Sequence, residues 1–171
     1  MQLDSLIRNI PDFPKPGIQF KDITTLLQNP EGFRETVEQM IAPYREEKID
    51  AVVGIESRGF IFGAPMALAL NVPFVLIRKP GKLPAETVSE SYTLEYGTDT
   101  IEMHADALKT GDRVLLVDDL LATGGTLAAA ANLVRKVGAH PIAAALLIEL
   151  TFLNGRNKLD GLPVHTLMKV D

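Results

Sequence analysis

Residues 114–126 decide the class of the fold, and they read Val114-Leu115-Leu116-Val117-Asp118-Asp119-Leu120-Leu121-Ala122-Thr123-Gly124-Gly125-Thr126. The first four are continuously apolar, which is typical of a strand buried on both faces of a parallel sheet. Two aspartates and a threonine–glycine loop follow, and a helix is expected from about residue 126 to residue 137, before Gly138. A buried strand that passes through a loop into a helix is the repeating unit of an α/β sheet.

The same alternation of strands and helices continues on both sides of this stretch. The predicted elements are strands over 51–55, 74–77, 91–96 and 141–148, and helices over 59–70 and from Asn29-Pro30-Glu31 onward. Residues 1–30 contain three closely spaced prolines and are expected to form an irregular cap. We predict one α/β domain over 1–171, with its core at about 50–150 and a mainly parallel sheet flanked by helices.

The composition excludes several classes of protein. Of 171 residues, 46% are hydrophobic and 23% are charged, as in a globular domain. The absence of cysteine excludes disulfides, thiolate zinc sites and cysteine nucleophiles, and it fits a cytoplasmic location. A net charge of −5 argues against general nucleic-acid binding. No apolar run approaches the ~20 residues of a membrane span, and the N-terminal residues lack the pattern of a secretory signal.

The decisive stretch also carries the strongest candidate for a site. In open α/β sheets, ligands bind beyond the carboxyl ends of the strands. The segment Ala122–Thr126 has the composition of a phosphate cradle, because glycines expose backbone N–H groups, threonines add hydroxyl donors and a helix begins there. The charges of Asp118 and Asp119 need compensation, which the hydroxyls of a ribose or a Mg²⁺ ion can supply. The segment therefore predicts a ribose 5-phosphate site.

Other interpretations of these motifs fit the sequence less well. Two acids after an apolar strand are also found in nucleoside triphosphatases. These enzymes require a lysine and a serine or threonine directly after the second glycine of their phosphate loop, whereas Phe60-Ile61 follow Gly54–Gly59 here. Ser57 lacks the preceding glycine of a hydrolase elbow, since Ile55 occupies that position. A purely structural alternative, in which the acids cap the helix and the glycines form a turn, stays open at this point.

Five blocks of sequence resemble one known family. Residues 117–126 are similar to the phosphoribosyl diphosphate signature of the type I phosphoribosyltransferases. The blocks that resemble the adenine-using members of that family are Phe13-Pro14-Lys15-Pro16-Gly17-Ile18-Gln19-Phe20-Lys21-Asp22-Ile23, Glu56-Ser57-Arg58-Gly59-Phe60, Arg78-Lys79-Pro80-Gly81-Lys82-Leu83-Pro84 and Tyr92-Thr93-Leu94-Glu95-Tyr96-Gly97. The resemblance implies the type I fold with a small N-terminal hood over 1–30, and the conversion of adenine and phosphoribosyl diphosphate to AMP and diphosphate in purine salvage.

The resemblance also implies roles for individual residues. The ribose hydroxyls would be held by Asp118 and Asp119, and the 5′-phosphate by Ala122, Thr123, Gly124, Gly125 and Thr126. The diphosphate would be bound by Ser57 and Arg58, in a loop that often contains a cis peptide bond, and by Arg78, Lys79 and Lys82 on a mobile lid within 78–96. Mg²⁺ is expected through substrate oxygens and water, with no protein ligand assigned. A homodimer is implied as well, with neither a membrane nor a nucleic acid as partner.

The choice of base depends on a different set of residues. Related enzymes for hypoxanthine and guanine typically carry an aspartate where this sequence has Ala122, and that aspartate manages the proton on the incoming base. In this sequence a carboxylate from another position must do so. The resemblance and the alternation of residues 91–96 point to Glu95, which would pair with N7 of the purine; the alternative is that Glu95 is an exposed strand glutamate. The adenine pocket is expected to contain Gln19, Phe20 and Lys21, with Phe20 stacked on the base.

Two alternatives to adenine transfer stay open. The same chemistry could act on another base, such as xanthine. A ligand-sensing regulator of the same fold would carry a DNA-binding module with a basic face, whereas the residues before position 50 resemble the hood of the enzyme.

Overall fold

The computed structural model describes residues 1–94 and 96–171. Backbone contacts among these residues divide the chain into two compact units, Met1–Gln39 and Met40–Asp171. The larger unit contains the sheet and the pocket that lies at the ends of its strands. That the chain forms a single functional domain stays a prediction.

The smaller unit is more regular than the prolines suggested. It contains the 3₁₀ helix η1 (Leu3–Leu6), the short helix α1 (Thr24–Leu27), and the strands β1 (Arg8–Ile10) and β2 (Phe20–Asp22). The expectation of an irregular segment over 1–30 was wrong because all three prolines lie in the loop between β1 and β2 and leave the strands free to pair. The pairing is reinforced where Arg8 donates to the carboxylate of Asp22, its partner across the ribbon, at 2.5 and 2.9 Å.

The helix predicted after Asn29 is present as α2 (Pro30–Ile41). Its start follows the predicted rule, because the side chain of Asn29 accepts a hydrogen bond of 2.9 Å from the N–H of Gly32. Its end also has a local cause, since Pro43 lies in the 3₁₀ helix η2 (Ala42–Tyr44) that follows.

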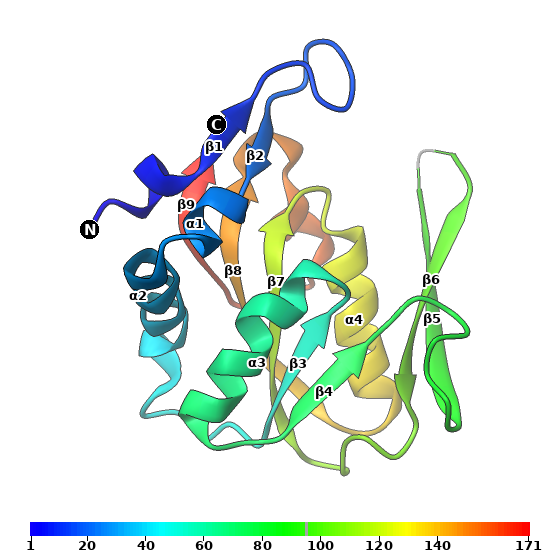
Figure 1. Ribbon diagram of the computed structural model, residues 1–171. Helices are drawn as coiled ribbons and strands as arrows, with labels where there is room; N and C mark the ends of the chain where they lie inside the picture. The colour runs from blue at the N-terminus through cyan, green and yellow to red at the C-terminus, as the bar shows by residue number, and fades with distance from the viewer. Residues whose placement is uncertain (95) are drawn as a thin grey trace. The chain divides into compact units, whose positions relative to one another are not determined.

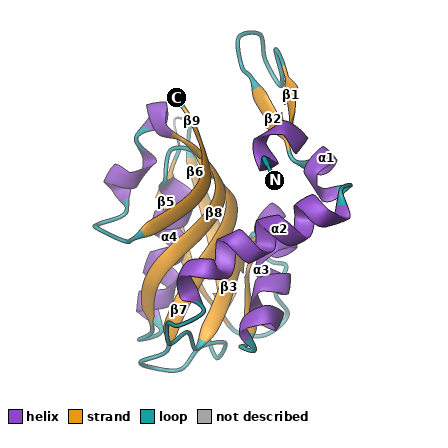
Figure 2. Cartoon of the chain, turned by 90° about the vertical axis from the view of Figure 1, so that its left-hand side faces the viewer, coloured by secondary structure: helices purple, strands orange, loops and turns teal. Residues whose placement is uncertain are grey.

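In the described part of the chain, the larger unit has a sheet of five parallel strands in the order β4-β3-β7-β8-β9. The strands are β3 (Ala51–Ile55), β4 (Phe74–Ile77), β7 (Arg113–Leu121), β8 (His140–Leu150) and β9 (Val164–Val170). The strands form a twisted sheet, as is typical of parallel sheets (Figure 2). The parallel α/β class predicted from the apolar runs is therefore confirmed.

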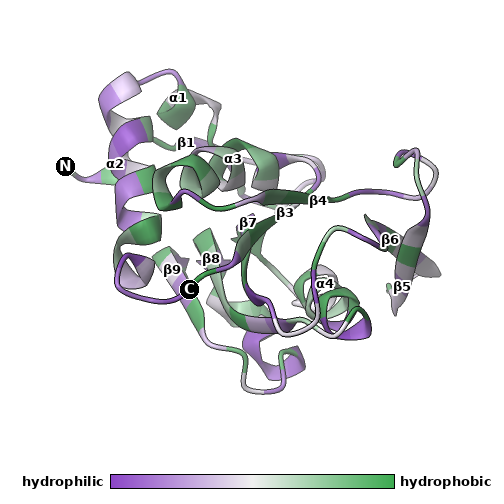
Figure 3. Cartoon of the chain, turned by 90° about the horizontal axis from the view of Figure 1, so that it is seen from below, coloured by the Kyte–Doolittle hydropathy of each residue, from purple (hydrophilic) through white to green (hydrophobic). Residues whose placement is uncertain are grey.

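Helices α3 (Arg58–Leu70) and α4 (Gly125–Lys136) cover opposite faces of this sheet (Figure 3). The alternation of side chains in β7 explains why both faces are apolar. Val114 and Leu116 join the cluster that contains the buried face of α4, whereas Leu115 and Val117 are buried outside that cluster. Continuous apolar runs thus correspond to strands covered on both sides, as predicted.

Three parts of the larger unit differ from the prediction. Strand β7 continues through both aspartates to Leu121, because its pairing with β8 does not stop at Val117. Strand β9 was missed, since its sequence has no continuous apolar run and most of it is only half-buried. The loop predicted over 78–90 is partly a strand, because β5 (Thr87–Thr93) pairs antiparallel with β6 (Thr98–His104), which was also missed.

The β5–β6 hairpin projects beside β4 and α4 at one edge of the larger unit (Figure 1). The strand predicted over 91–96 ends at Thr93 in the structure, and Glu95 lies outside the described residues. Among the described residues, no helix combines the length and the apolar character required to cross a bilayer.

Candidate active site

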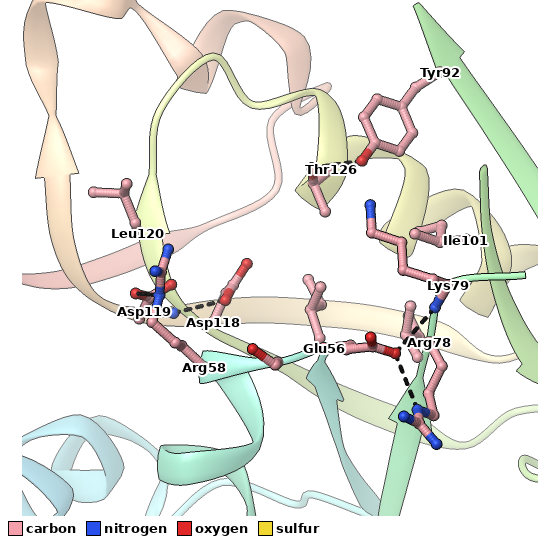
Figure 4. Close-up of a pocket in the computed structure, with 13 residues that line it drawn as sticks. Glu56, Arg58, Arg78, Lys79, Tyr92, Ile101, Asp118, Asp119, Leu120 and Thr126 are labelled. Carbon is pink, nitrogen blue, oxygen red and sulfur yellow. Dashed lines mark hydrogen bonds and ion pairs between the residues drawn. The ribbon is translucent and has the colours of Figure 1, made fainter. Parts of the chain in front are cut away.

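A cavity of about 300 Å³ lies where β3, β4 and β7 end (Figure 4). Its wall combines residues from these strand ends with others from the β5–β6 hairpin and the start of α4. The lining residues are Ile55, Glu56, Ser57, Arg58, Ile77, Arg78, Lys79, Tyr92, Ile101, Asp118, Asp119, Leu120 and Thr126. The cavity thus brings together most of the residues predicted to bind ribose and diphosphate, at the edge of the sheet where ligands of this fold class bind.

The aspartate pair forms one side of the cavity. Asp119 is only 7% exposed, and its carboxylate accepts a hydrogen bond of 2.6 Å from Nε of Arg58. The carboxylate of Asp118 accepts a hydrogen bond of 2.8 Å from the N–H of Asp119. Burial, followed by the charge of Asp119, raises the pKa of Asp118 well above its ordinary value. The pair offers acceptor oxygens to hydroxyl donors, and Arg58 already compensates one of its charges.

The position of Arg58 depends on the glycine that follows it. A Cβ on Gly59 would lie 2.7 Å from the carbonyl oxygen of Val117 and 3.2 Å from a carboxylate oxygen of Asp118. Only glycine therefore lets the first turn of α3 approach β7 this closely. The peptide bond between Glu56 and Ser57 is cis, as the resemblance implied. Because the first turn of α3 lies so close to β7 at Gly59, Nε of Arg58 reaches the carboxylate of Asp119.

Two of the predicted cations, Arg78 and Lys82, converge on the carboxylate of Glu56, which also accepts a hydrogen bond from the backbone of Lys79. Its Oε1 accepts hydrogen bonds from Nε of Arg78 at 3.0 Å and from the backbone N–H of Lys79 at 3.2 Å. Its Oε2 accepts one from Nζ of Lys82 at 2.6 Å. Lys82 does not line the cavity itself, but through Glu56 it joins the same group. These contacts hold the cationic loop at the edge of the cavity, where it can bind an anion.

The titration of Glu56 tests this arrangement. Its hydrogen bond with Lys82 is the main reason that the pKa of the Glu56 carboxyl falls from 4.5 to about 2. Because the folded pKa is the lower one, ionised Glu56 stabilises the folded protein above about pH 4.5, and this contribution is lost as the pH falls towards 2. We expect an NMR titration of this carboxyl to give a midpoint near 2, and Lys82→Ala to move it towards 4.5. Lys109→Ala is the control, and an unchanged midpoint in Lys82→Ala would contradict the assignment.

A chain of hydrogen bonds links the hairpin to the start of α4. The hydroxyl of Thr126 donates to that of Tyr92 at 3.0 Å, and Tyr92 donates to Asp99 at 3.2 Å. The same Asp99 oxygen accepts a hydrogen bond of 2.5 Å from Nζ of Lys79. The predicted 5′-phosphate and diphosphate residues are therefore connected across the cavity through side chains of the hairpin.

The resemblance placed Glu56 in the diphosphate loop with Ser57 and Arg58, but its contacts with Arg78 and Lys82 were not predicted. Sequence reasoning missed Tyr92 and Asp99 as members of the site. Tyr92 belongs to a quoted family block, so the resemblance could have drawn attention to it. Asp99 had no such signal, since it lies on the unpredicted strand β6. Tyr92 and Asp99 lie opposite each other because β5 pairs with β6, and no local pattern in the sequence reveals that pairing.

The predicted phosphate loop connects β7 to α4. Gly124 is the residue that precedes the helix, and its φ of +89° is a conformation that glycine adopts without strain. A Cβ at this position would also overlap the carbonyl oxygen of Gly155. Thr126 lines the cavity, while Ala122, Thr123 and Gly125 are not among its lining residues. The glycine pattern predicted as a phosphate cradle thus coincides with a helix N-terminus in the structure.

The residues predicted to recognise the base lie elsewhere in the chain. Gln19 accepts a hydrogen bond of 2.8 Å from the side chain of Asn9, and the Phe20 ring packs edge-on against Phe13, with centroids 5.2 Å apart. Both residues, with Lys21, belong to the smaller unit. The predicted proton acceptor, Glu95, is outside the described residues, so the roles of these four residues stay predictions.

The acidic residues of the cavity suit an oxygen-seeking cation that is held mainly by its substrate. Asp118 and Asp119 offer hard oxygen ligands to the same space. The described residues contain no group of three or more His, Cys, Asp or Glu side chains that could form a closed metal site. Mg²⁺ typically keeps several waters and binds through one or two carboxylates and substrate phosphates, so this donor set fits it.

Comparisons with known proteins agree with this site. A family model described as a phosphoribosyl transferase domain matches residues 22–161. The adenine phosphoribosyltransferase of Acaryochloris marina is 58% identical over 169 residues, which are 99% of either sequence. The crystal structure of adenine phosphoribosyltransferase from Rhodothermus marinus has 54% identity and a TM-score of 0.93, and the match covers 98% of this chain and 96% of that one.

A further solved structure carries ligands. It is the adenine phosphoribosyltransferase of Saccharomyces cerevisiae in complex with D-2,5-dideoxy-2,5-imino-altritol 1,6-bisphosphate and adenine. The identity is 42%, the TM-score is 0.92, and the match covers 97% of this chain and 96% of that one. The chain therefore belongs to the phosphoribosyltransferase family and, within it, to the adenine phosphoribosyltransferases.

Proposed function

We propose that this protein transfers the 5-phosphoribosyl group of phosphoribosyl diphosphate to adenine, which yields AMP and diphosphate and salvages the purine. The observation that carries the proposal is the cavity itself, in which the aspartate pair lies between Arg58 and the start of α4. One sugar phosphate can span the aspartates and the glycine loop, with its diphosphate towards the cations. The yeast relative that binds adenine supports the choice of base.

The ion pair between Arg58 and Asp119 suggests how the site receives its substrate. In the structure, Nε of Arg58 lies 2.6 Å from the carboxylate of Asp119, so the two charges compensate each other. When phosphoribosyl diphosphate binds, Arg58 can turn its guanidinium to the diphosphate while Asp119 accepts a ribose hydroxyl, so that neither charge is left unpaired. Arg78 and Lys79 can add positive charge where the leaving group gains negative charge.

The reaction breaks the bond from the anomeric carbon to diphosphate and forms a bond from that carbon to N9 of adenine. The sugar passes through an oxocarbenium-like state, by analogy with glycoside transfer. Adenine would react as the tautomer that carries its proton on N7, so that Glu95 takes this proton while the free lone pair of N9 forms the new bond. Phe20 stacks on the ring, with Gln19 and Lys21 at its edge. Bound Mg²⁺ would neutralise diphosphate charge, held by substrate oxygens, water and the carboxylates of Asp118 and Asp119.

Two further properties complete the proposal. We infer a homodimer from the family to which the chain belongs. We also propose a cytoplasmic location, which the cysteine-free sequence fits.

One assay tests the proposed function directly. Purified protein is incubated with phosphoribosyl diphosphate, MgCl₂ and each of adenine, hypoxanthine, guanine and xanthine, and nucleotide formation is measured. AMP formed from adenine alone supports the proposal. Turnover of another base in preference to adenine would reassign the substrate, and no turnover with any base would favour a ligand-sensing regulator. Omission of MgCl₂ tests the metal requirement separately.

The role of Glu95 predicts a specific kinetic result. Glu95→Gln removes the proton acceptor but keeps the size of the side chain, so kcat should fall by about 10²–10⁴-fold, the usual contribution of a general acid or base. The KM for adenine should change far less, because the lost interaction is made in the transition state. Glu90→Gln, on the preceding strand β5, serves as the control. An unchanged kcat in Glu95→Gln would remove this residue from the mechanism.

A further inference from the structure

The predicted 5′-phosphate loop rests on the backbone of a second segment. This segment is the 3₁₀ helix η4 (Gly155–Lys158), which lies between β8 and β9 and beside the start of α4 (Figure 1). A Cβ on Gly124 would overlap the carbonyl oxygen of Gly155, and a Cβ on Gly155 would lie 2.6 Å from the carbonyl oxygen of Ala122. Two glycine backbones therefore pack directly on each other, with no side chain between them to absorb a shift.

The next residue in η4 is tied to the sheet by a two-pronged ion pair. Arg156 donates to Glu149 from Nε and from Nη2, and both hydrogen bonds measure 2.8 Å. Its remaining terminal nitrogen, Nη1, donates to the carbonyl oxygen of Val164 at 3.1 Å. Such a planar, bidentate contact fixes the orientation of the guanidinium as well as its position.

Glu149, the acid of this ion pair, is buried and makes a further hydrogen bond. Glu149 is only 5% exposed and lies on β8, opposite Leu121 at the end of β7. It accepts a further hydrogen bond of 3.3 Å from the hydroxyl of Thr166 on β9. The chain leaves β7 at Leu121 and immediately forms the phosphate loop, so Glu149 lies on the strand beside the point where that loop begins. Neither Glu149 nor Arg156 lines the cavity.

We propose that Glu149 and Arg156 are positioning residues for the 5′-phosphate loop: their ion pair fixes Gly155, and Gly155 fixes the backbone of Ala122–Gly124. The proposal rests on the proposed function, in which this loop binds the 5′-phosphate through its N–H groups. Several N–H groups must point at one phosphate, so a small displacement of the loop weakens all of them together. The diphosphate residues are attached to β3, β4 and the β5–β6 hairpin, and this ion pair does not support them.

The test compares ligands that engage the two ends of the site. Calorimetry with ribose 5-phosphate reports on the 5′-phosphate loop, and calorimetry with inorganic pyrophosphate reports on the diphosphate residues. We expect Glu149→Gln and Arg156→Lys each to weaken ribose 5-phosphate binding by about tenfold, since displacement of a binding group by about 1 Å can cost up to 10²-fold. The affinity for pyrophosphate should stay within about twofold of wild type in both variants.

The control is a cation at the opposite end of the sheet. Arg113 starts β7 and donates to the carbonyl oxygen of Lys48 at 2.8 Å, so Arg113→Ala removes an arginine contact at the end of β7 far from the phosphate loop. It should leave both affinities unchanged. Circular dichroism melts of all variants establish that each is folded at the temperature of the titrations.

The outcomes separate this inference from the proposed function. Unchanged ribose 5-phosphate affinity in folded Glu149→Gln and Arg156→Lys would overturn the positioning role. Equal weakening of both ligands would overturn it too, because a general loosening of the fold would then explain the loss. Failure of the wild-type protein to convert adenine would instead overturn the proposed function, and that result comes from a different measurement.

Discussion

Asp119→Ala is expected to weaken the binding of phosphoribosyl diphosphate by about 100-fold or more, because a hydrogen bond to a charged group contributes about 1.5–3 kcal/mol and a ribose diol makes more than one. The substitution removes an acceptor that is only 7% exposed and that the structure holds at 2.6 Å from Arg58. The fold should survive, since the side chain of Arg58 is 48% exposed and can be hydrated when its partner is lost. Calorimetry with phosphoribosyl diphosphate and MgCl₂ measures the affinity, and a thermal melt checks the fold.

A second carboxylate provides the matched control for this experiment. Asp50 precedes β3, at the opposite end of the sheet, and accepts a hydrogen bond of 2.8 Å from the N–H of Arg113. Asp50→Ala also removes an acid that accepts a hydrogen bond, but it should leave the affinity for phosphoribosyl diphosphate unchanged. Wild-type affinity in Asp119→Ala would contradict the placement of the ribose at the aspartate pair.

Gly124→Ala is expected to raise KM for phosphoribosyl diphosphate by about tenfold or more and to lower Tm. Two effects add at this position. The φ of +89° costs an alanine about 1–2 kcal/mol, and its methyl group would overlap the carbonyl oxygen of Gly155. The loop can relieve the overlap only by moving away from Gly155, and this movement displaces the N–H groups that are proposed to bind the 5′-phosphate. Steady-state kinetics and a thermal melt measure the two consequences.

A substitution at Gly111 is the control that distinguishes the effect of the steric overlap from the effect of backbone strain. Gly111 has a φ of +87°, almost the same as that of Gly124, yet a Cβ there would meet nothing within 4 Å. Gly111→Ala should therefore lower Tm through the same unfavourable φ while KM stays at the wild-type value. Equal KM values in the two variants would mean that contact with Gly155 does not position the loop.

Much of the sheet could be predicted because its signals are local. The run Val114–Val117 is apolar at every position, and its short length and valines favour a strand covered on both faces, where all four side chains are buried. The start of α2 was equally readable, since Asn29 caps the helix with its own side chain three residues away. Strands β9 and β6, and most of β5, escaped prediction because none of them has a continuous apolar run and most of their residues are exposed or only half-buried. Their stability comes from pairing partners that no local pattern reveals.

Part of the site could likewise be predicted from the sequence, and part depended on the tertiary structure. The order of residues along the chain was enough to place Asp118, Asp119 and the glycine loop at the end of one strand, because neighbours in sequence must be neighbours in space. Tertiary structure alone decided that Arg58 pairs with Asp119, that Glu56 gathers Arg78 and Lys82, and that Gly155 supports Gly124. Each of these contacts joins residues that are 22 to 61 positions apart or segments on different strands, so its geometry depends on how the sheet brings strand ends together.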